Sequence, residues 1–213
     1  MPGKVPTEGG RWVRKGICVP MIILCLLLSG CGGTEGGGSS AADTLRQPYR
    51  QMEECSMTAE VACGGTEEQT AFTLQCRYVP GGKSTVEVLA PDTAAGIRAT
   101  LEGERLELVY DGLVLPAGSL SSEDIAPASC LPRLMDALRE GWLLEENEET
   151  LDGEKCVRLC LDQTGEKGGK IVSVLWLRQA DGTPVLGEIS VEDTVILQAR
   201  FTDFQFGAII PSE

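Results

Sequence analysis

The 213-residue chain contains no histidine, and only 5% of its residues are aromatic. The lack of histidine excludes Ser-His-Asp and Cys-His catalysis and removes the commonest zinc ligand. Carbohydrate-binding faces and base-stacking platforms generally use more aromatic side chains than this chain has. The sequence also lacks a nucleophile elbow, a phosphate-binding loop and a metal-ligand cluster. We therefore expect no enzymatic activity, no catalytic residues, no cofactor and no metal site.

A hydrophobic run long enough to cross a membrane is also missing. The apolar run from Ile17 to Leu28 has 12 residues and is interrupted by Pro20, whereas a membrane-spanning helix needs about 20. Basic residues precede this run, and Leu28-Ser29-Gly30-Cys31 closes it, which is the pattern of a bacterial lipoprotein signal peptide with its lipobox. We predict cleavage before Cys31, lipidation of its thiol, and anchoring to the extracytoplasmic face of the cell membrane.

Positive charge is scarce once that signal is removed. The remaining chain has 14 Lys and Arg against 31 Asp and Glu, a net charge of −17. Nucleic acid and anionic lipid headgroups repel such a surface, so acyl chains rather than side chains would hold it on the membrane. We expect three parts: a lipoprotein signal peptide (residues 1–30), a Gly/Ser-rich tether (31–44) and a β-rich domain (45–213).

Alternating apolar and polar residues dominate beyond the tether and predict ten or eleven strands. Short connections favour a mostly antiparallel sheet. A short helix is expected from Leu45 to Glu53, and a clearer one after Pro127, with Ser129 as N-cap and Gly141 just past its end. The expected fold is a β-dominated α+β domain, with a curved antiparallel sheet covered by one or two helices. The apolar stripe of the clearer helix is Leu131, Leu134, Met135 and Leu138.

Six cysteines remain after Cys31, an even number that outside the cytoplasm permits disulfides; buried free thiols are the alternative. A first hairpin with its turn at Gly65-Thr66 would place Cys55 opposite Cys76 and Met57 opposite Leu74. This register puts the apolar residues of both strands on one face. It makes Cys55 and Cys76 neighbours, and a disulfide between them is feasible at a non-hydrogen-bonded site.

The C-terminal strands resemble those of the LolA/LppX-like lipoprotein-carrier superfamily, in particular Gram-positive lipoproteins labelled outer-membrane lipoprotein-sorting proteins. The segments that carry the likeness are Val157-Arg158-Leu159, Val174-Leu175-Trp176-Leu177, Pro184-Val185-Leu186-Gly187-Glu188-Ile189 and Phe201-Thr202-Asp203-Phe204-Gln205-Phe206. The resemblance implies an incomplete antiparallel β-barrel with helices across its concave side. It also implies a cavity that binds acyl chains, or a surface that senses partner proteins. A lipid-anchored chain cannot shuttle freely between membranes, so sorting is not implied.

The expected function is a non-enzymatic, membrane-anchored lipoprotein that binds an apolar ligand, a lipid or acyl group, between sheet and helix. Cavity candidates are the four-residue helix stripe together with Trp142 and Trp176. Single aromatic residues in apolar strands are more often core, and the sequence does not distinguish a cavity wall from core for the helix stripe. The alternative is a protein-interaction or envelope-sensing module, with an envelope protein as partner, on the same fold. The acidic run from Glu145 to Glu149 lacks the order of a calcium loop and is expected to be a solvated strand end or loop.

Overall fold

The computed structural model describes residues 40–64, 70–119, 125–165 and 169–207, all within one compact unit, Ser39–Glu213. These residues form two helices and eleven strands, as the sequence predicts. No helix among them is long and apolar enough to span a bilayer. The helices are α1 (Ala41–Gln51) and α2 (Pro127–Glu140). The strands are β1 (Cys55–Cys63), β2 (Thr70–Tyr78), β3 (Lys83–Ala90), β4 (Arg98–Glu102), β5 (Arg105–Tyr110), β6 (Leu113–Ser119), β7 (Trp142–Leu151), β8 (Glu154–Asp162), β9 (Ile171–Arg178), β10 (Pro184–Val191) and β11 (Thr194–Phe206).

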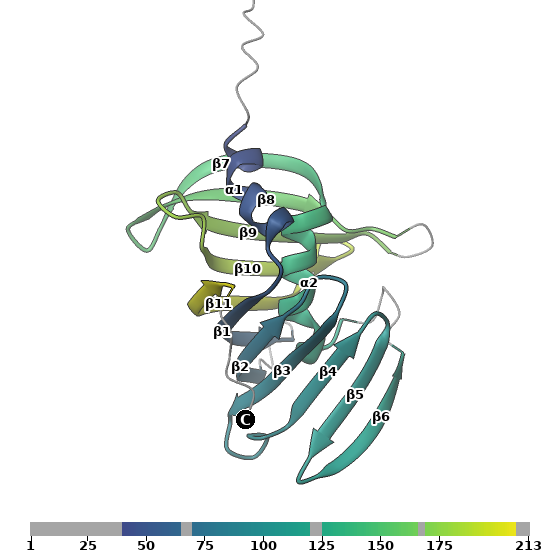
Figure 1. Ribbon diagram of the computed structural model, residues 1–213. Helices are drawn as coiled ribbons and strands as arrows, with labels where there is room; N and C mark the ends of the chain where they lie inside the picture. The colour runs from purple at the N-terminus through teal and green to yellow at the C-terminus, as the bar shows by residue number, and fades with distance from the viewer. Residues whose placement is uncertain (1–39, 65–69, 120–124, 166–168, 208–213) are drawn as a thin grey trace, which may run out of the picture. The chain divides into compact units, whose positions relative to one another are not determined.

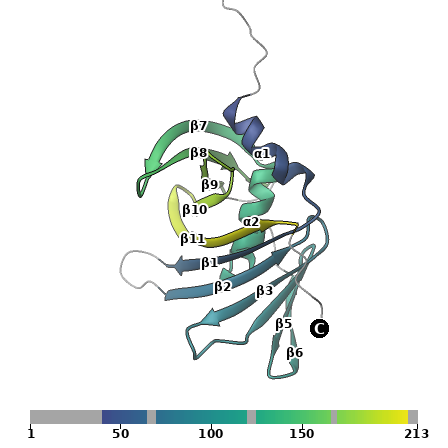
Figure 2. The same ribbon diagram turned by 60° about the vertical axis from the view of Figure 1, so that its left-hand side comes forward.

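All eleven strands form a single antiparallel sheet in the order β6-β5-β4-β3-β2-β1-β11-β10-β9-β8-β7. Neighbours in the sheet are neighbours in sequence except at the centre, where β1 pairs with β11. Strands β6 and β7 are the free edges, so the sheet is not closed into a barrel. It curves around α2, which packs against strands from both halves of the concave face (Figures 1 and 2). The predicted curved, β-dominated fold is therefore confirmed.

The hairpin of β1 and β2 forms as predicted, but the predicted register is wrong by two residues. Cys55 lies opposite Tyr78, and Met57 lies opposite Cys76. Cys63 pairs with Thr70 at the other end of the hairpin. A slip of two residues keeps every side chain on its original face, so the apolar pattern cannot distinguish the two registers. Cys55 and Cys76 both remain buried, and both are free thiols rather than a disulfide.

Helix α2 begins three residues earlier than expected. Its N-cap is Ala126, and Pro127 occupies the first helical position, where a missing N–H costs nothing. Ser129 is inside the first turn, where its Oγ accepts a hydrogen bond from the Ala126 N–H at 3.2 Å. The expected end of the helix is correct, since the Gly141 N–H donates to the Ala137 carbonyl at 2.9 Å. Both ends of the helix are thus capped by local hydrogen bonds.

Helix α1 begins at Ala41, so residues 41–44 of the expected tether are helical. The Ser40 hydroxyl caps it by accepting a bond from the Asp43 N–H at 3.0 Å. Its buried face includes Tyr49, whose hydroxyl donates to the Gly182 carbonyl at 2.6 Å. Arg46 lies on the same face and is only 3% exposed. This helix therefore belongs to the folded domain and packs beside α2 (Figure 1).

Candidate functional site

The four residues of the predicted helix stripe are brought together, but as solid core. Leu131, Leu134, Met135 and Leu138 are each 0% exposed. The approach of α2 to the sheet is close at Gly187, where an added Cβ would lie 2.7 Å from Leu134 Cδ1. A side chain larger than glycine at this position would require the Leu134 side chain to move. The stripe therefore fills the space between helix and sheet, and its contacts are with other side chains of the core.

The two tryptophans lie away from this stripe. Trp142 starts the edge strand β7 and is 76% exposed. Trp176 alternates with the buried Leu175 and Leu177, so its ring lies on the opposite face of the sheet. There its Nε1 donates to Glu149 at 2.8 Å. The acidic run lies in the middle of β7 rather than in a loop, and its charges blunt that edge of the sheet.

An uncharged surface lies instead on the concave face of β3–β6. We call this surface the apolar floor. Cross-strand partners share a face, so the register assigns these residues to it: Val86, Val88, Ile97, Ala99, Leu101, Leu106, Leu108, Tyr110, Leu113 and Leu115. The opposite face of the same strands carries charge, including the Glu87–Arg98 ion pair at 2.8 Å.

The apolar floor passes from buried to exposed towards the edge strand β6. Across one row, Val86 is 2% exposed, Ala99 is 3% exposed and Leu115 is 57% exposed. Beside this row, Tyr110 and Leu113 flank the Asp111-Gly112 turn and are 50% and 66% exposed. Isolated exposed apolar side chains are ordinary, but a contiguous group that continues the core indicates a binding surface. Sequence reasoning placed these strands but missed their exposure.

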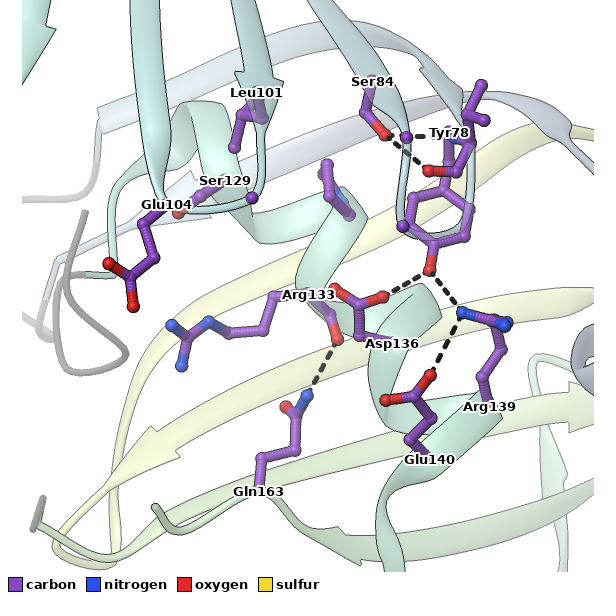
Figure 3. Close-up of a pocket in the computed structure, with 15 residues that line it drawn as sticks. Tyr78, Ser84, Leu101, Glu104, Ser129, Arg133, Asp136, Arg139, Glu140 and Gln163 are labelled. Atoms are coloured by element: carbon purple, nitrogen blue, oxygen red, sulfur yellow. Dashed lines mark hydrogen bonds and ion pairs between the residues drawn. The ribbon is translucent and has the colours of Figure 1, made fainter. Parts of the chain in front are cut away.

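A cleft of about 460 Å³ opens at the other end of the floor (Figure 3). Its walls are the polar side of α2 and the tips of the β2–β3 and β4–β5 hairpins, with Gln163 below. Leu101 lies in both the floor and the cleft. Charged side chains of both signs line it: Arg133, Arg139, Glu104, Asp136 and Glu140.

A hydrogen-bonded network fixes one wall of the cleft. The Tyr78 hydroxyl donates to Asp136 and accepts from Arg139 Nη1 at 3.4 Å. The same Nη1 contacts Glu140 at 3.3 Å (Figure 3). Burial, reinforced by the negative charge of Asp136, raises the pKa of Tyr78, so the hydroxyl stays protonated at neutral pH. Desolvation also raises the pKa of Asp136, whereas its bond from Tyr78 opposes the shift.

The opposite side of the cleft is held by an amide. Gln163 Nε2 donates to the Arg133 carbonyl at 3.1 Å, and its Oε1 accepts from the Ser173 hydroxyl at 2.6 Å. Within the described residues, no three His, Cys, Asp or Glu side chains are grouped as metal ligands. The arrangement therefore offers non-covalent recognition: an apolar surface that leads into a polar cleft.

No family model and no curated protein matches the sequence. The predicted resemblance is found among solved structures. The chain is similar to a LolA superfamily protein from Nitrosomonas europaea, with 12% identity over 80% of this chain and 96% of that one, and a TM-score of 0.44. It is also similar to the lipoprotein LppX from Mycobacterium tuberculosis (12% identity, 80% and 97% coverage, TM-score 0.42). A third similar structure is the Pseudomonas aeruginosa MucA/MucB complex (17% identity, 82% and 59% coverage, TM-score 0.43). These likenesses concern the fold alone.

Proposed function

We propose that the protein is a lipid-anchored, extracytoplasmic binding protein that holds an acyl chain on the apolar floor. One observation carries this proposal: the uncharged face of β3–β6 continues the core and ends in side chains that are 50–66% exposed. A polar or charged ligand would gain no binding energy from such a surface. A hydrocarbon chain that covers the surface would remove its apolar side chains from water. The protein has no catalytic step in this proposal.

The exposed end of the floor offers a moderate binding energy. Fully burying a large apolar side chain contributes about 1.5–3 kcal/mol. Tyr110, Leu113 and Leu115 are about half exposed, so covering each contributes about 1 kcal/mol. Association also costs several kcal/mol of lost freedom. A ligand that binds well must therefore extend along the floor beyond these three residues, as a flexible chain can.

The lipid anchor at Cys31 completes this proposal. Cys31 lies outside the described residues, and its support is the lipobox with the basic and apolar segments that precede it. Several acyl chains on one protein hold it stably at a bilayer, whereas one chain does so only marginally. An anchored binding domain remains next to the lipids from which an acyl ligand would come.

A protein-interaction module is the second candidate, because the fully buried α2 stripe leaves a filled core at that position. The exposed edge strand β6 would then be the docking strand. However, the two-residue turn between Tyr110 and Leu113 makes that pair hydrogen-bonded. Alternation then directs the backbone of Val114 and Pro116 towards the free edge, where Pro116 has no N–H to donate. Strand addition is disfavoured there, so the face of β6 is a better binding surface than its edge.

Binding of a hydrophobic fluorophore tests this proposal, with displacement by a fatty acid as the specific readout. Replacing both Leu113 and Leu115 by serine removes about 2 kcal/mol of apolar contact, so the affinity should fall more than tenfold. The matched control is Val114→Ser, since Val114 lies between them, is 60% exposed and faces the other side of the sheet. Equal loss in both variants, or no binding by the unaltered chain, would reject the apolar floor as the site.

A further inference from the structure

The cleft and the apolar floor form one continuous surface. Leu101 is a residue of the floor and also lines the cleft. Ser84 lies opposite Leu101 in the register and lines the cleft as well. From Leu101 back to Ile97 the floor extends about 13 Å along β4, at about 3.3 Å per residue. A molecule with an extended chain on the floor therefore has one end at the cleft.

The charges of the cleft select against a ligand of one sign. Its lining contains two guanidinium groups, Arg133 and Arg139, and three carboxylates, Glu104, Asp136 and Glu140. The whole chain carries a net charge of −14, which repels a purely anionic ligand. A purely cationic ligand would offer no hydrogen-bond acceptor to the two guanidinium groups. A ligand group that carries one positive and one negative charge can pair with both the carboxylates and the guanidinium groups. Such a group has no net charge to be repelled.

Arg139 is held in the wall of the cleft by long contacts. Its side chain is only 19% exposed, and its Nε is buried without a hydrogen-bond partner in the described part of the chain. Its Nη1 contacts are long, at 3.4 Å to Tyr78 and 3.3 Å to Glu140. Glu140 is 73% exposed and so contributes a weak, solvent-screened pair. The long Nη1 contacts leave the exposed end of this guanidinium able to donate to an additional acceptor in the cleft.

We propose that the cleft binds a zwitterionic phosphate–ammonium head group whose acyl chain lies on the apolar floor. This inference rests on the proposed function and names the class of amphiphile. Phosphate oxygens would accept hydrogen bonds from Arg139 and Arg133, because guanidinium groups match phosphate geometry. The ammonium would donate to Glu104 and Glu140. The ligand then carries one charge for the guanidinium groups and one for the carboxylates that line the cleft.

Native mass spectrometry of the full chain in nonionic detergent tests this inference. The chain is mixed with equal amounts of three lipids of one acyl length: lysophosphatidylethanolamine, lysophosphatidylglycerol and a neutral monoacylglycerol. The unaltered protein should be enriched in the zwitterionic lipid. Arg139→Gln should reduce that enrichment about tenfold while retaining the monoacylglycerol. Arg133→Gln is a second variant in case the first unfolds, and Arg98→Gln on the charged face is the matched control.

The outcomes separate this inference from the proposed function. Equal binding of the three lipids would overturn the head-group site and leave acyl binding intact. A preference for the anionic lipid would also overturn it, because the carboxylates would then have no role. Failure of every lipid to bind would reject the proposed function itself. A last measurement uses soluble glycerophosphoethanolamine, which has the same head group but no acyl chain. If it binds as tightly as the lipid, the acyl chain has no role in binding.

Discussion

Arg46 should be the most sensitive charged residue for the stability of the domain. Its guanidinium lies at the C-terminal end of α2, where helix carbonyls have no intrahelical partner. Nε donates to the Leu138 carbonyl at 2.7 Å, and Nη2 donates to the Gly141 carbonyl at 2.7 Å and the Ala137 carbonyl at 3.3 Å. A cation at this end of a helix is also favoured by the helix dipole. One side chain of α1 thereby caps α2.

The expected loss of stability follows from the two short hydrogen bonds that Arg46 donates to the Leu138 and Gly141 carbonyls. A hydrogen bond from a charged donor contributes about 1.5–3 kcal/mol, and part of this is offset by removing a guanidinium from water. Arg46→Ala would also leave the Leu138 carbonyl buried without its partner. We expect the free energy of unfolding to fall by about 3 kcal/mol. For a domain of this size that corresponds to a melting temperature lower by about 6–12 °C.

Chemical denaturation followed by circular dichroism measures this change. The control is Arg50→Ala on the same helix, because Arg50 is 43% exposed and pairs with Asp43 at 3.4 Å. A surface pair of this kind contributes about 0–1 kcal/mol. Arg46→Lys should be intermediate, since an ammonium cannot span the same carbonyls as a planar fork. Equal stability of Arg46→Ala and Arg50→Ala would refute the capping role of Arg46.

Three further predictions concern cysteines and pH. Cys31→Ser should abolish incorporation of radiolabelled palmitate and release the protein from membranes; unchanged labelling would contradict the lipobox. At pH 7.5 a thiol reagent should modify the partly exposed Cys63 and Cys160 before the four fully buried thiols, as followed by peptide mass spectrometry, and uniform rates would argue against this core. Burial raises the pKa of Cys55 from 9.0 to about 12. Because the pKa is higher in the folded state, the contribution of the Cys55 thiol to the free energy of unfolding should be fully present below pH 9. This contribution should decrease as the pH rises from 9 to 12. Urea unfolding across that range tests the sign, and Cys55→Ala should weaken the decrease.

Local periodicity in the sequence was sufficient to predict most of the elements. The alternation of Cys55, Met57, Ala59 and Val61 predicts a half-buried strand, and β1 buries these four residues. The helical stripe after Pro127 likewise predicts α2 and its buried face. Both patterns arise because one side of an element meets the core, which a period of 2.0 or 3.6 residues records directly. The strand count and antiparallel sheet follow from these elements and their short connections.

Features that depend on contacts between residues far apart in the sequence could not be predicted from local periodicity. The hairpin register differs by two residues from the prediction because both registers bury the same faces. Ser129 has the chemistry of an N-cap, yet the chain enters the helix earlier, at Pro127. Trp142 and Trp176 appear in apolar strands, but β7 is an edge and Trp176 is on the face that carries Arg158 and Glu149.

The candidate site is decided by tertiary structure alone. In the sequence, Leu108 and Leu115 are equivalent apolar residues of neighbouring strands. In the fold, Leu108 is packed against the core while Leu115 is 57% exposed, because α2 lies over one part of the sheet and not over its β6 edge. The cleft likewise forms only where two hairpin tips meet the polar side of α2 (Figure 3). Alternation along a strand determines which face is apolar, but the crossing of a distant helix determines how much of that face stays exposed.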